Sequence, residues 1–483
     1  MIRIDQVTWT YPYADAPSLR ELSLAVAPGE FVVLCGASGC GKSTALRLMN
    51  GLIPHFHEGG NLTGTVTVSG LSTDVVEPDE IGLRTGTVLQ HPRRQFFTDT
   101  VREEIAFAME NFGFPPEAIR TQVTTTIAEL AVGVPTDQRL QYLSGGQQQQ
   151  VAIAAAMAHR PRILLLDEPS SNLSADAVRR LTATLADLKG KGVTIVIAEH
   201  RLRYLQDLVD RVVVMRDGTV DIEWSAAQFH TVPDDMLARE GLRGTVRAAE
   251  LPAVAASGAS AANPVPSDDV PSAALELAGV HCRLGGRTVL DLECVAFAAG
   301  EVTAIHGVNG AGKSTLARVV TGLQSCPGTV LLDGKPVKPR ARRRASAIVM
   351  QDVQRQLFTD RVETEIELAA NGVAGAPTAS KMLATLDLAH LADRHPLSLS
   401  GGQQQRLVVA AARVCDRRIV VFDEPSSGVD RRHLQSISDQ IRQIAADGSV
   451  VLLISHDEDL IALTADRQLT LTPAARTAND AQR

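Results

Sequence analysis

Short runs of apolar residues recur along the chain and alternate with stretches of helical periodicity. The N-terminal residues, MIRIDQVTW, alternate apolar with polar positions, which is typical of a half-buried strand. The segment from Gln90 to Ser144 lacks strand-like runs and is expected to be helical. Four runs have the composition of strands buried on both faces: 31–35, 162–167, 193–199 and 212–218. The pattern predicts an α/β protein with a parallel sheet.

Three motifs each occur twice. GASGCGKST begins at residue 36 and GVNGAGKST at 307, LSGGQ begins at 143 and 399, and DEPSS begins at 167 and 423. In both copies 23 residues separate the serine of LSGGQ from the aspartate of DEPSS, and a histidine follows that aspartate after 33 more. Two copies of one domain explain this spacing.

The repeats divide the chain into a first domain, 1–245, and a second domain, 274–473. The first copy carries an extra loop at 53–64. Residues 246–273 are rich in alanine, proline and serine, which predicts a flexible linker. Residues 474–483 form a polar tail.

Composition excludes several classes of function. The formal net charge of −8 argues against a general nucleic-acid or anionic-membrane binder. No apolar run approaches the 18 or more residues of a membrane span, so we expect any membrane role to require a partner. The six cysteines form no C-x-x-C pair, and we expect free thiols in a reducing cytosol.

Both copies of the first motif fit G-x-x-x-x-G-K-[ST] between an apolar strand and a helix, which is the context of a phosphate-binding P-loop. The glycines let backbone N–H groups surround phosphates, and the lysine neutralises them. The residues expected to bind ATP here are Gly36, Ala37, Ser38, Gly39, Cys40, Gly41, Lys42, Ser43, Thr44, Gly307, Val308, Asn309, Gly310, Ala311, Gly312, Lys313, Ser314 and Thr315.

The DEPSS motif supplies candidate metal ligands and bases. Asp167 and Asp423 end apolar runs, where a carboxylate beside a P-loop serine suits Mg²⁺. The adjacent Glu168 and Glu424 are expected to polarise the attacking water. The recurring histidines, His200 and His456, are expected at the γ-phosphate or the catalytic water.

The LSGGQ motif is expected to open a helix whose N-terminus binds a second anion. Its residues are Ser144, Gly145, Gly146, Gln147, Ser400, Gly401, Gly402 and Gln403. Alone, the string would be an ordinary helix cap, but its fixed spacing from the other two motifs makes it nearly specific.

Together these motifs resemble the ABC ATPases over 1–245 and 274–473. The resemblance implies two ABC-type P-loop NTPase domains, each with a RecA-like α/β core, a helical subdomain and an antiparallel β portion. It also implies an intramolecular dimer of the two domains, in which Mg²⁺ and ATP lie between the P-loop of one half and LSGGQ of the other. Gln90 and Gln351 take the place of the family's Mg²⁺-binding and catalytic glutamine, and Ser43 and Ser314 that of its Mg²⁺-binding serine.

Three segments resemble more narrowly the fused ATPase subunits of energy-coupling factor (ECF) transporters: 50–56, 95–107 and 351–370. This implies a peripheral protein at the cytoplasmic face of the membrane. Its partners would be a transmembrane coupling subunit and a membrane-embedded subunit that binds a vitamin, metal ion or similar small solute, with no nucleic acid. The apolar pairs Phe96–Phe97 and Leu357–Phe358 are expected on the partner-facing surface, the alternative being the core. Arg93 and Arg94 stand where the family commonly has acidic residues.

Two alternatives stay open: a soluble tandem ABC ATPase acting on ribosomes, and a tandem sugar-importer ATPase. The first typically has a long, charged, helical interdomain segment, and the second a different signature and a degraded site. The sequence shows neither feature.

The two halves differ at the position where the family stacks an aromatic ring on adenine. Tyr11 ends the run VTWTY, whereas Leu284 ends the matching run VHCRL. After DEPSS the first half has Asn172-Leu173-Ser174 and the second Gly428-Val429-Asp430, and the resemblance implies that Ser174 would face Lys313. Both differences predict a weaker ATP site at Lys313 than at Lys42.

Overall fold

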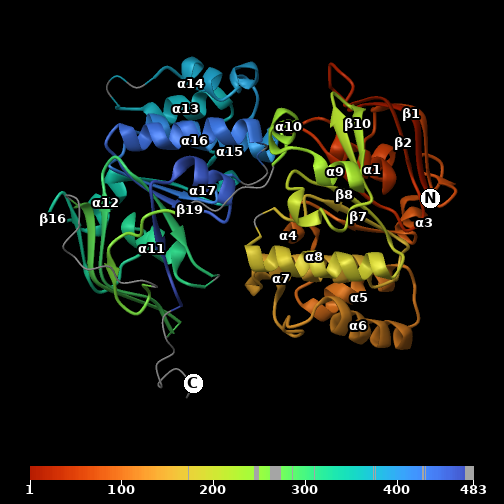
Figure 1. Cartoon of the computed structure of the whole chain (residues 1–483), viewed down its shortest axis with the longest axis horizontal. Helices are drawn as coiled ribbons and strands as arrows, with labels where there is room; N and C mark the ends of the chain where they lie inside the picture. Colours follow the sequence, from red (N-terminus) through yellow and green to blue (C-terminus); the bar gives the residue numbers. More distant parts are fainter. Residues whose placement is uncertain are drawn as a thin grey trace. The chain divides into compact units, whose positions relative to one another are not determined.

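A computed structural model describes residues 1–171, 173–243, 250–261, 273–285, 287–308, 310–373, 375, 377–426, 429 and 431–473. The chain divides into two compact units, Met1–Thr245 and Val246–Arg483 (Figure 1). Outside the described residues lie the tail 474–483, part of the expected linker, and four positions that the sequence singled out: Asn172, Asn309, Gly428 and Asp430.

The first unit is built on a six-stranded sheet of order β10-β9-β3-β8-β7-β6. All neighbours are parallel except the edge strand β10. The strands are β3 (Phe31–Cys35), β6 (Thr85–Val88), β7 (Ile163–Asp167), β8 (Thr194–Ala198), β9 (Arg211–Arg216) and β10 (Thr219–Ser225). The predicted parallel α/β sheet is confirmed, and its central apolar runs are buried on both faces.

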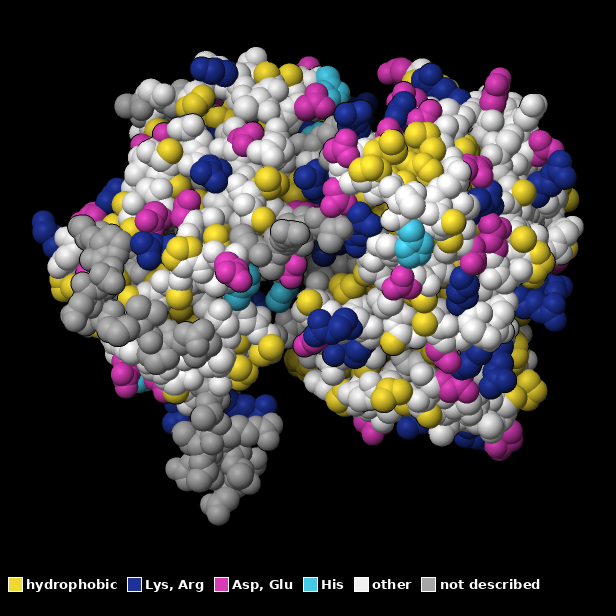
Figure 2. Space-filling model, in the orientation of Figure 1, with side chains coloured by type: hydrophobic (Ala, Val, Ile, Leu, Met, Phe, Trp, Pro, Cys, Tyr) yellow, Lys and Arg dark blue, Asp and Glu magenta, His cyan; other side chains and the backbone are white. Residues whose placement is uncertain are grey.

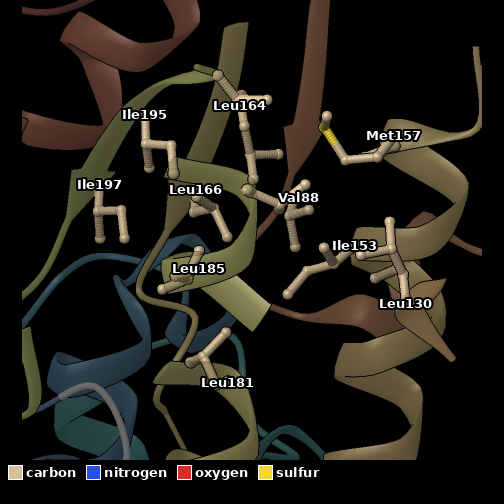
Figure 3. Packing of buried hydrophobic residues seen from close by; sticks show 14 of the residues in the cluster. Val88, Leu130, Ile153, Met157, Leu164, Leu166, Leu181, Leu185, Ile195 and Ile197 are labelled. Carbon is tan, nitrogen blue, oxygen red and sulfur yellow. The ribbon is translucent and has the colours of Figure 1, made fainter. Parts of the chain in front are cut away.

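Side chains of this sheet pack on helices of the same unit. Figure 3 shows Val88 of β6, Leu164 of β7 and Ile195 of β8 directed toward residues of the flanking helices. The partners come from three helices, α6 (Pro116–Leu130), α7 (Gly145–Met157) and α8 (Ala175–Gly190). This core fixes the carboxyl ends of β3, β7 and β8, where the predicted site residues lie.

A second, antiparallel sheet of order β2-β1-β4-β5 completes the sheets of the first unit. Its strands are β1 (Ile2–Thr10), β2 (Leu19–Val26), β4 (Asn61–Val68) and β5 (Leu71–Ser72). The alternation in β1 slips after Ile4, where Gln6 adopts a φ of 48°, so that Val7 and Trp9 are also buried. Residues 53–64, expected to form an extra loop, instead contribute most of α2 (Leu52–His55) and the start of β4.

The segment after Gln90 is helical, as predicted. It contains α4 (Pro92–Gln95), α5 (Val101–Asn111), α6 and the 3-10 helix η1 (Leu140–Tyr142). Helices α5, α6 and α7 lie together at one end of the unit, away from β1 and β2 (Figure 1). The remaining helices are α1 (Lys42–Met49), α3 (Pro78–Gly82), η2 (Arg203–Leu205), α9 (Ala226–Thr231) and α10 (Asp234–Arg239).

The second unit repeats this plan. Its parallel sheet, of order β17-β18-β19-β14-β20, consists of β14 (Val302–His306), β17 (Ser346–Val349), β18 (Ile419–Asp423), β19 (Val450–Ile454) and β20 (Arg467–Thr470). Its antiparallel sheet, of order β11-β13-β12-β15-β16, consists of β11 (Ala256–Ser257), β12 (Ala273–Leu284), β13 (Arg287–Ala298), β15 (Thr329–Leu332) and β16 (Lys335–Pro336).

The helices of the second unit follow the same order along the chain. They are α11 (Lys313–Val320), α12 (Pro339–Ala345), η4 (Val353–Gln356), α13 (Val362–Ala370), α14 (Ala379–Thr385), η5 (Ala389–Leu391), η6 (Pro396–Ser398), α15 (Gly401–Val414), α16 (Arg431–Ala446) and α17 (Glu458–Thr464). Nowhere in the described parts of the chain is a helix both long and apolar enough to cross a bilayer. On the visible face of each unit, side chains of both charge signs are interspersed (Figure 2).

The prediction that 246–273 is a flexible linker is wrong for residues 250–261. Strand β11 pairs with β13, and the Val254 amide donates to the Gln468 carbonyl at 2.8 Å. Val254 and Ala256 are buried in the core of the second unit. The small side chains that gave this segment a linker composition let its backbone approach the sheet edge closely.

Candidate nucleotide-binding sites

The first P-loop joins β3 to α1 with a tightly packed backbone. Gly36 has a φ of 136°, and a Cβ atom there would lie 2.2 Å from the Met215 carbonyl oxygen, so only glycine fits. Gly41 (φ 104°) precedes the helix, and the buried Lys42 is its first residue. The Lys42 ammonium donates to the carbonyls of Gly36 and Ala37, both at 3.0 Å. The P-loop therefore holds the Lys42 ammonium group against its own backbone carbonyls.

The second P-loop, between β14 and α11, repeats this geometry. Gly307 has a φ of 143° and lies against the Leu471 carbonyl. Lys313 donates to the carbonyls of Gly307 at 2.6 Å and Val308 at 3.3 Å. Burial lowers the pKa of Lys313, opposed by the charges of Glu424 and Asp423. Each P-loop lysine is thus associated with the acidic pair of its own half.

Both DEPSS aspartates lie beside the serine of their own P-loop. The Ser43 hydroxyl donates to Asp167 at 3.0 Å, and Ser314 hydrogen-bonds Asp423. Burial, reinforced by the charge of Glu168, raises the pKa of Asp167 to about 6, and burial likewise raises that of Asp423. A hydroxyl and a buried carboxylate are hard oxygen donors of the kind that Mg²⁺ takes together with nucleotide phosphates. No group of three or more His, Cys, Asp and Glu side chains suited to a metal occurs among the described residues.

Glu168 is held by three side-chain donors. Gln90 Nε2 lies 2.9 Å and Ser171 Oγ 3.2 Å from one carboxylate oxygen, and His200 Nε2 lies 3.1 Å from the other. Burial acts to raise the pKa of Glu168, but the hydrogen bond and charge of His200, together with Lys42, lower it to about 2. The group is an anionic acceptor at neutral pH, as a residue that polarises water requires.

Glu424 has the same backbone conformation as Glu168 but different partners. Both glutamates have positive φ, 45° for Glu168 and 55° for Glu424, which is rare outside glycine and is typical of functional positions. Glu424 accepts from the Ser455 hydroxyl and the His456 amide, both at 3.3 Å, while His456 Nε2 lies 3.9 Å away. The Gln351 side chain is exposed. The described hydrogen bonds of Glu424 are thus longer than those of Glu168.

Both LSGGQ motifs begin helices, as predicted. Ser144 Oγ accepts from the Gln147 amide at 3.4 Å and Gln147 Oε1 accepts from the Ser144 amide at 3.0 Å, a reciprocal cap that Ser400 and Gln403 repeat. A Cβ atom at Gly146 would lie 2.7 Å from that of Ala177, so glycine lets α7 pack on α8. The binding of a nucleotide by Gly145, Gly401 and Gly402 stays a prediction.

Tyr11 is fixed by contacts that the sequence did not reveal. Its hydroxyl lies 3.2 Å from Thr44 Oγ1 and accepts from Arg47 at 3.2 Å. Its ring packs edge to face on Trp9 and His57, with centroid distances of 5.6 and 5.0 Å. A half-buried ring is thereby held next to the P-loop helix. Leu284, at the end of β12, is 40% exposed.

The segments after DEPSS are described only in part. Ser174 caps α8 by accepting from the Ala177 amide, and Leu173 and Val429 are buried. Sequence reasoning missed Ser171 and Ser455, the hydroxyls bound to the two glutamates. Sequence position was the available signal, because Ser171 is the last residue of DEPSS and Ser455 directly precedes His456.

Two P-loops, each with a serine–aspartate pair and a largely buried glutamate at positive φ, define a tandem P-loop nucleotide-hydrolysing protein. The model of the family described as "ABC transporter" matches residues 19–171 and 294–427. The chain belongs to this family, whose members work with membrane components, and it is an ATPase.

Relatives and a solved structure match nearly the whole chain. A Treponema denticola protein with the provisional name ABC transporter ATP-binding protein is 37% identical, covering 98% of this chain and 95% of the relative. A Bacillus subtilis protein provisionally named HMP/thiamine import ATP-binding protein YkoD is 30% identical, covering 98% and 90%. The structure titled "Model of ribosome-bound archaeal Pelota and ABCE1" matches with a TM-score of 0.66 at 21% identity, covering 97% of this chain and 78% of that one, which shows the fold alone.

We expect the two ATP sites to differ in affinity. With Lys313→Ala the Lys42 site remains, and this variant should bind ATP several-fold more tightly than Lys42→Ala, because stacking on an aromatic ring contributes about 1–3 kcal/mol. Adding Tyr11→Leu should remove the difference, since Leu284 already stands at the matching position. Titration with a fluorescent nucleotide measures the affinity of each variant. Equal affinities for the two lysine variants would contradict the prediction.

Proposed function

We propose that this chain energises an ECF-type uptake system for a vitamin, metal ion or similar small solute from the cytoplasmic face of the membrane. Its partners are a transmembrane coupling subunit and a membrane-embedded substrate-binding subunit. The similarity to a protein named for HMP/thiamine import supports uptake. The observation that carries the proposal is an exposed phenylalanine held in the same way in each half.

Phe97 lies in a turn fixed by the buried Glu104. One Glu104 carboxylate oxygen accepts from the amides of Phe97 and Thr98, both at 3.0 Å, and from the Thr98 hydroxyl at 2.9 Å. The Phe97 ring is 73% exposed and stacks on Phe107 at 5.0 Å. Its neighbour Phe96 packs against the core.

The second half repeats the arrangement with different neighbours. Glu365 accepts from the amides of Phe358 and Thr359 at 3.1 and 3.0 Å and from the Thr359 hydroxyl at 2.8 Å. Phe358 is 77% exposed, while Leu357 is buried. Each apolar pair that the sequence singled out is therefore divided, with one member in the core and one at the surface.

In each half, the three hydrogen bonds to a buried carboxylate fix the backbone of the turn that carries the exposed aromatic ring. Rigid exposed aromatic side chains are typical of anchors that enter a partner's pocket. Their presence after both Gln90 and Gln351 suits a coupling subunit that offers one docking element to each half. Arg93, at the position where the resemblance led us to expect an acidic residue, donates instead to Gln148 at 3.0 Å.

In the proposed cycle, each P-loop lysine and the following residues hold the ATP phosphates, and the LSGGQ serine of the other half completes the site. The Ser43–Asp167 and Ser314–Asp423 pairs, with Gln90 and Gln351, would hold Mg²⁺, which when bound would neutralise charge on the phosphates. Glu168 and Glu424 accept a hydrogen bond from the attacking water and polarise it, and His200 and His456 orient that water.

Charge at the two phenylalanines tests the docking role. Phe97→Asp with Phe358→Asp should remove the chain from the membrane fraction of its own cells and abolish solute uptake, because a carboxylate cannot enter an apolar pocket at low cost. Basal ATPase activity of the purified variant should stay within about twofold of wild type, since surface substitutions of this kind are usually mild. Tyr13→Asp, at a fully exposed aromatic residue outside the two turns, is the matched control.

Retained membrane association and uptake in the double variant would overturn the proposal. Co-sedimentation of the wild type with ribosomes instead of membranes would favour the ribosomal alternative, for which the present support is fold likeness. Loss of cooperative thermal unfolding would show that the two rings stabilise the helical region.

A further inference from the structure

Glu199 is a buried carboxylate that the hydrolytic scheme does not use. It follows β8 directly, immediately before His200, and is 2% exposed. One oxygen accepts from the amides of His200 and Arg201, at 2.8 and 3.2 Å. The other accepts from the Tyr204 hydroxyl at 2.9 Å and the Ser170 amide at 3.4 Å. Four donors converge on one buried side chain.

These donors come from segments that also contact Glu168. His200 donates to Glu168 through Nε2, and Ser171, next to Ser170, donates through its hydroxyl. The Glu199 carboxylate thus fixes the backbone beneath two of the side chains that hold Glu168. Tyr204 anchors the carboxylate from η2.

The second half has different residues at the positions of Glu199 and Tyr204. Ser455 replaces Glu199, and Leu460 replaces Tyr204. Ser455 donates directly to Glu424 at 3.3 Å, and Leu460 is fully buried. In the second half, a serine hydroxyl contacts the Glu424 carboxylate directly. In the first half, Glu199 instead holds the backbone of the residues near Glu168.

We infer that Glu199, braced by Tyr204, is a positioning residue that sets the geometry of Glu168 through His200 and Ser171. The inference rests on the proposed hydrolytic roles of Glu168 and His200. It concerns water orientation and leaves the phosphate contacts of Lys42 unchanged. Its loss should therefore lower kcat and spare the KM for ATP.

The test is steady-state ATP hydrolysis by the purified full chain carrying Glu424→Gln, so that turnover reports the Glu168 site and this parent is the reference for every variant. Glu199→Gln keeps the size of the side chain but presents an amide group to backbone donors, and kcat should fall about tenfold, as expected for a small misplacement of catalytic groups. Tyr204→Phe should lower kcat about threefold, because one of four donors is removed. KM should change by less than about twofold in both variants. Tyr13→Phe is the control for removing an exposed tyrosine hydroxyl.

A transplanted pair separates positioning from general stability. Glu199→Ser with Tyr204→Leu gives the first half the residues of the second, and the new hydroxyl should donate to Glu168 as Ser455 does to Glu424. Its kcat should recover to within about threefold of the Glu424→Gln parent. An unchanged kcat for a folded Glu199→Gln, or a double variant no better than Glu199→Gln, would overturn the inference. Unchanged turnover when Glu168→Gln is added to the Glu424→Gln parent would instead remove the proposed role of Glu168 itself.

Discussion

Replacing both Glu168 and Glu424 by glutamine is expected to lower ATP turnover by about 10²–10⁴-fold, the usual contribution of a general base. Each glutamate lies at positive φ beside the aspartate paired with its P-loop serine, and the pKa of Glu168 is lowered to about 2. Glutamine preserves the size of the side chain but accepts a proton from water poorly. Phosphate release measures turnover. Equilibrium binding of labelled ATP should stay close to wild type, because Lys42 and Lys313 are unaltered.

Two single variants and one surface control test whether the loss of turnover comes from these two glutamates. Glu110→Gln changes an exposed glutamate in α5 and should leave turnover unaltered. Each single variant, Glu168→Gln and Glu424→Gln, should retain part of the activity if the other half hydrolyses ATP independently. Wild-type turnover in the double variant would show that neither glutamate acts on water.

The parallel sheets and the position of the P-loops could be predicted because their sequence signals are local. An apolar run such as 31–35 is buried on both faces, and the following loop requires glycine where Gly36 meets the Met215 carbonyl. Helix starts at Ser144 and Ser400 were predictable for the same reason, since a capping serine and a glutamine three residues later close the cap locally.

Features that depend on contacts distant in sequence were not predictable. Residues 250–261 have the composition of a linker, yet they pack on β13 because an open sheet edge offers backbone partners. Which phenylalanine of the pair Phe96–Phe97 faces outward depends on Glu104, seven residues beyond Phe97. The contact of Ser455 with Glu424, 31 residues apart in sequence, likewise appears only when loops from different strands meet.

Asp167→Asn combined with Asp423→Asn is expected to abolish turnover and yet stabilise the nucleotide-free protein. Burial raises the pKa of Asp167 from 3.8 to about 6 and also raises that of Asp423. Because the folded state binds the proton more tightly than the unfolded state, stability is lost as the pH rises from about 4 to about 6. Above that range the ionised Asp167 costs about 2–3 kcal/mol, at about 1.4 kcal/mol per pKa unit.

A neutral asparagine removes this cost while its oxygen still accepts from Ser43, so the unfolding midpoint at pH 7.5 should rise by about 5 °C. At pH 5, midway through that range, the gain should fall to about half, and it should vanish only below about pH 3.8, where the carboxyl is protonated in the unfolded chain as well. Mg²⁺ with ATP should stabilise the wild type and have little effect on the variant, because the carboxylate ligands are gone. Asp137→Asn, at a side chain that is 90% exposed, is the control and should leave the midpoint unchanged. A midpoint that falls equally at both pH values would show that the two carboxylates stabilise the fold, in which case the sites are held together by the groups that we assign to the metal.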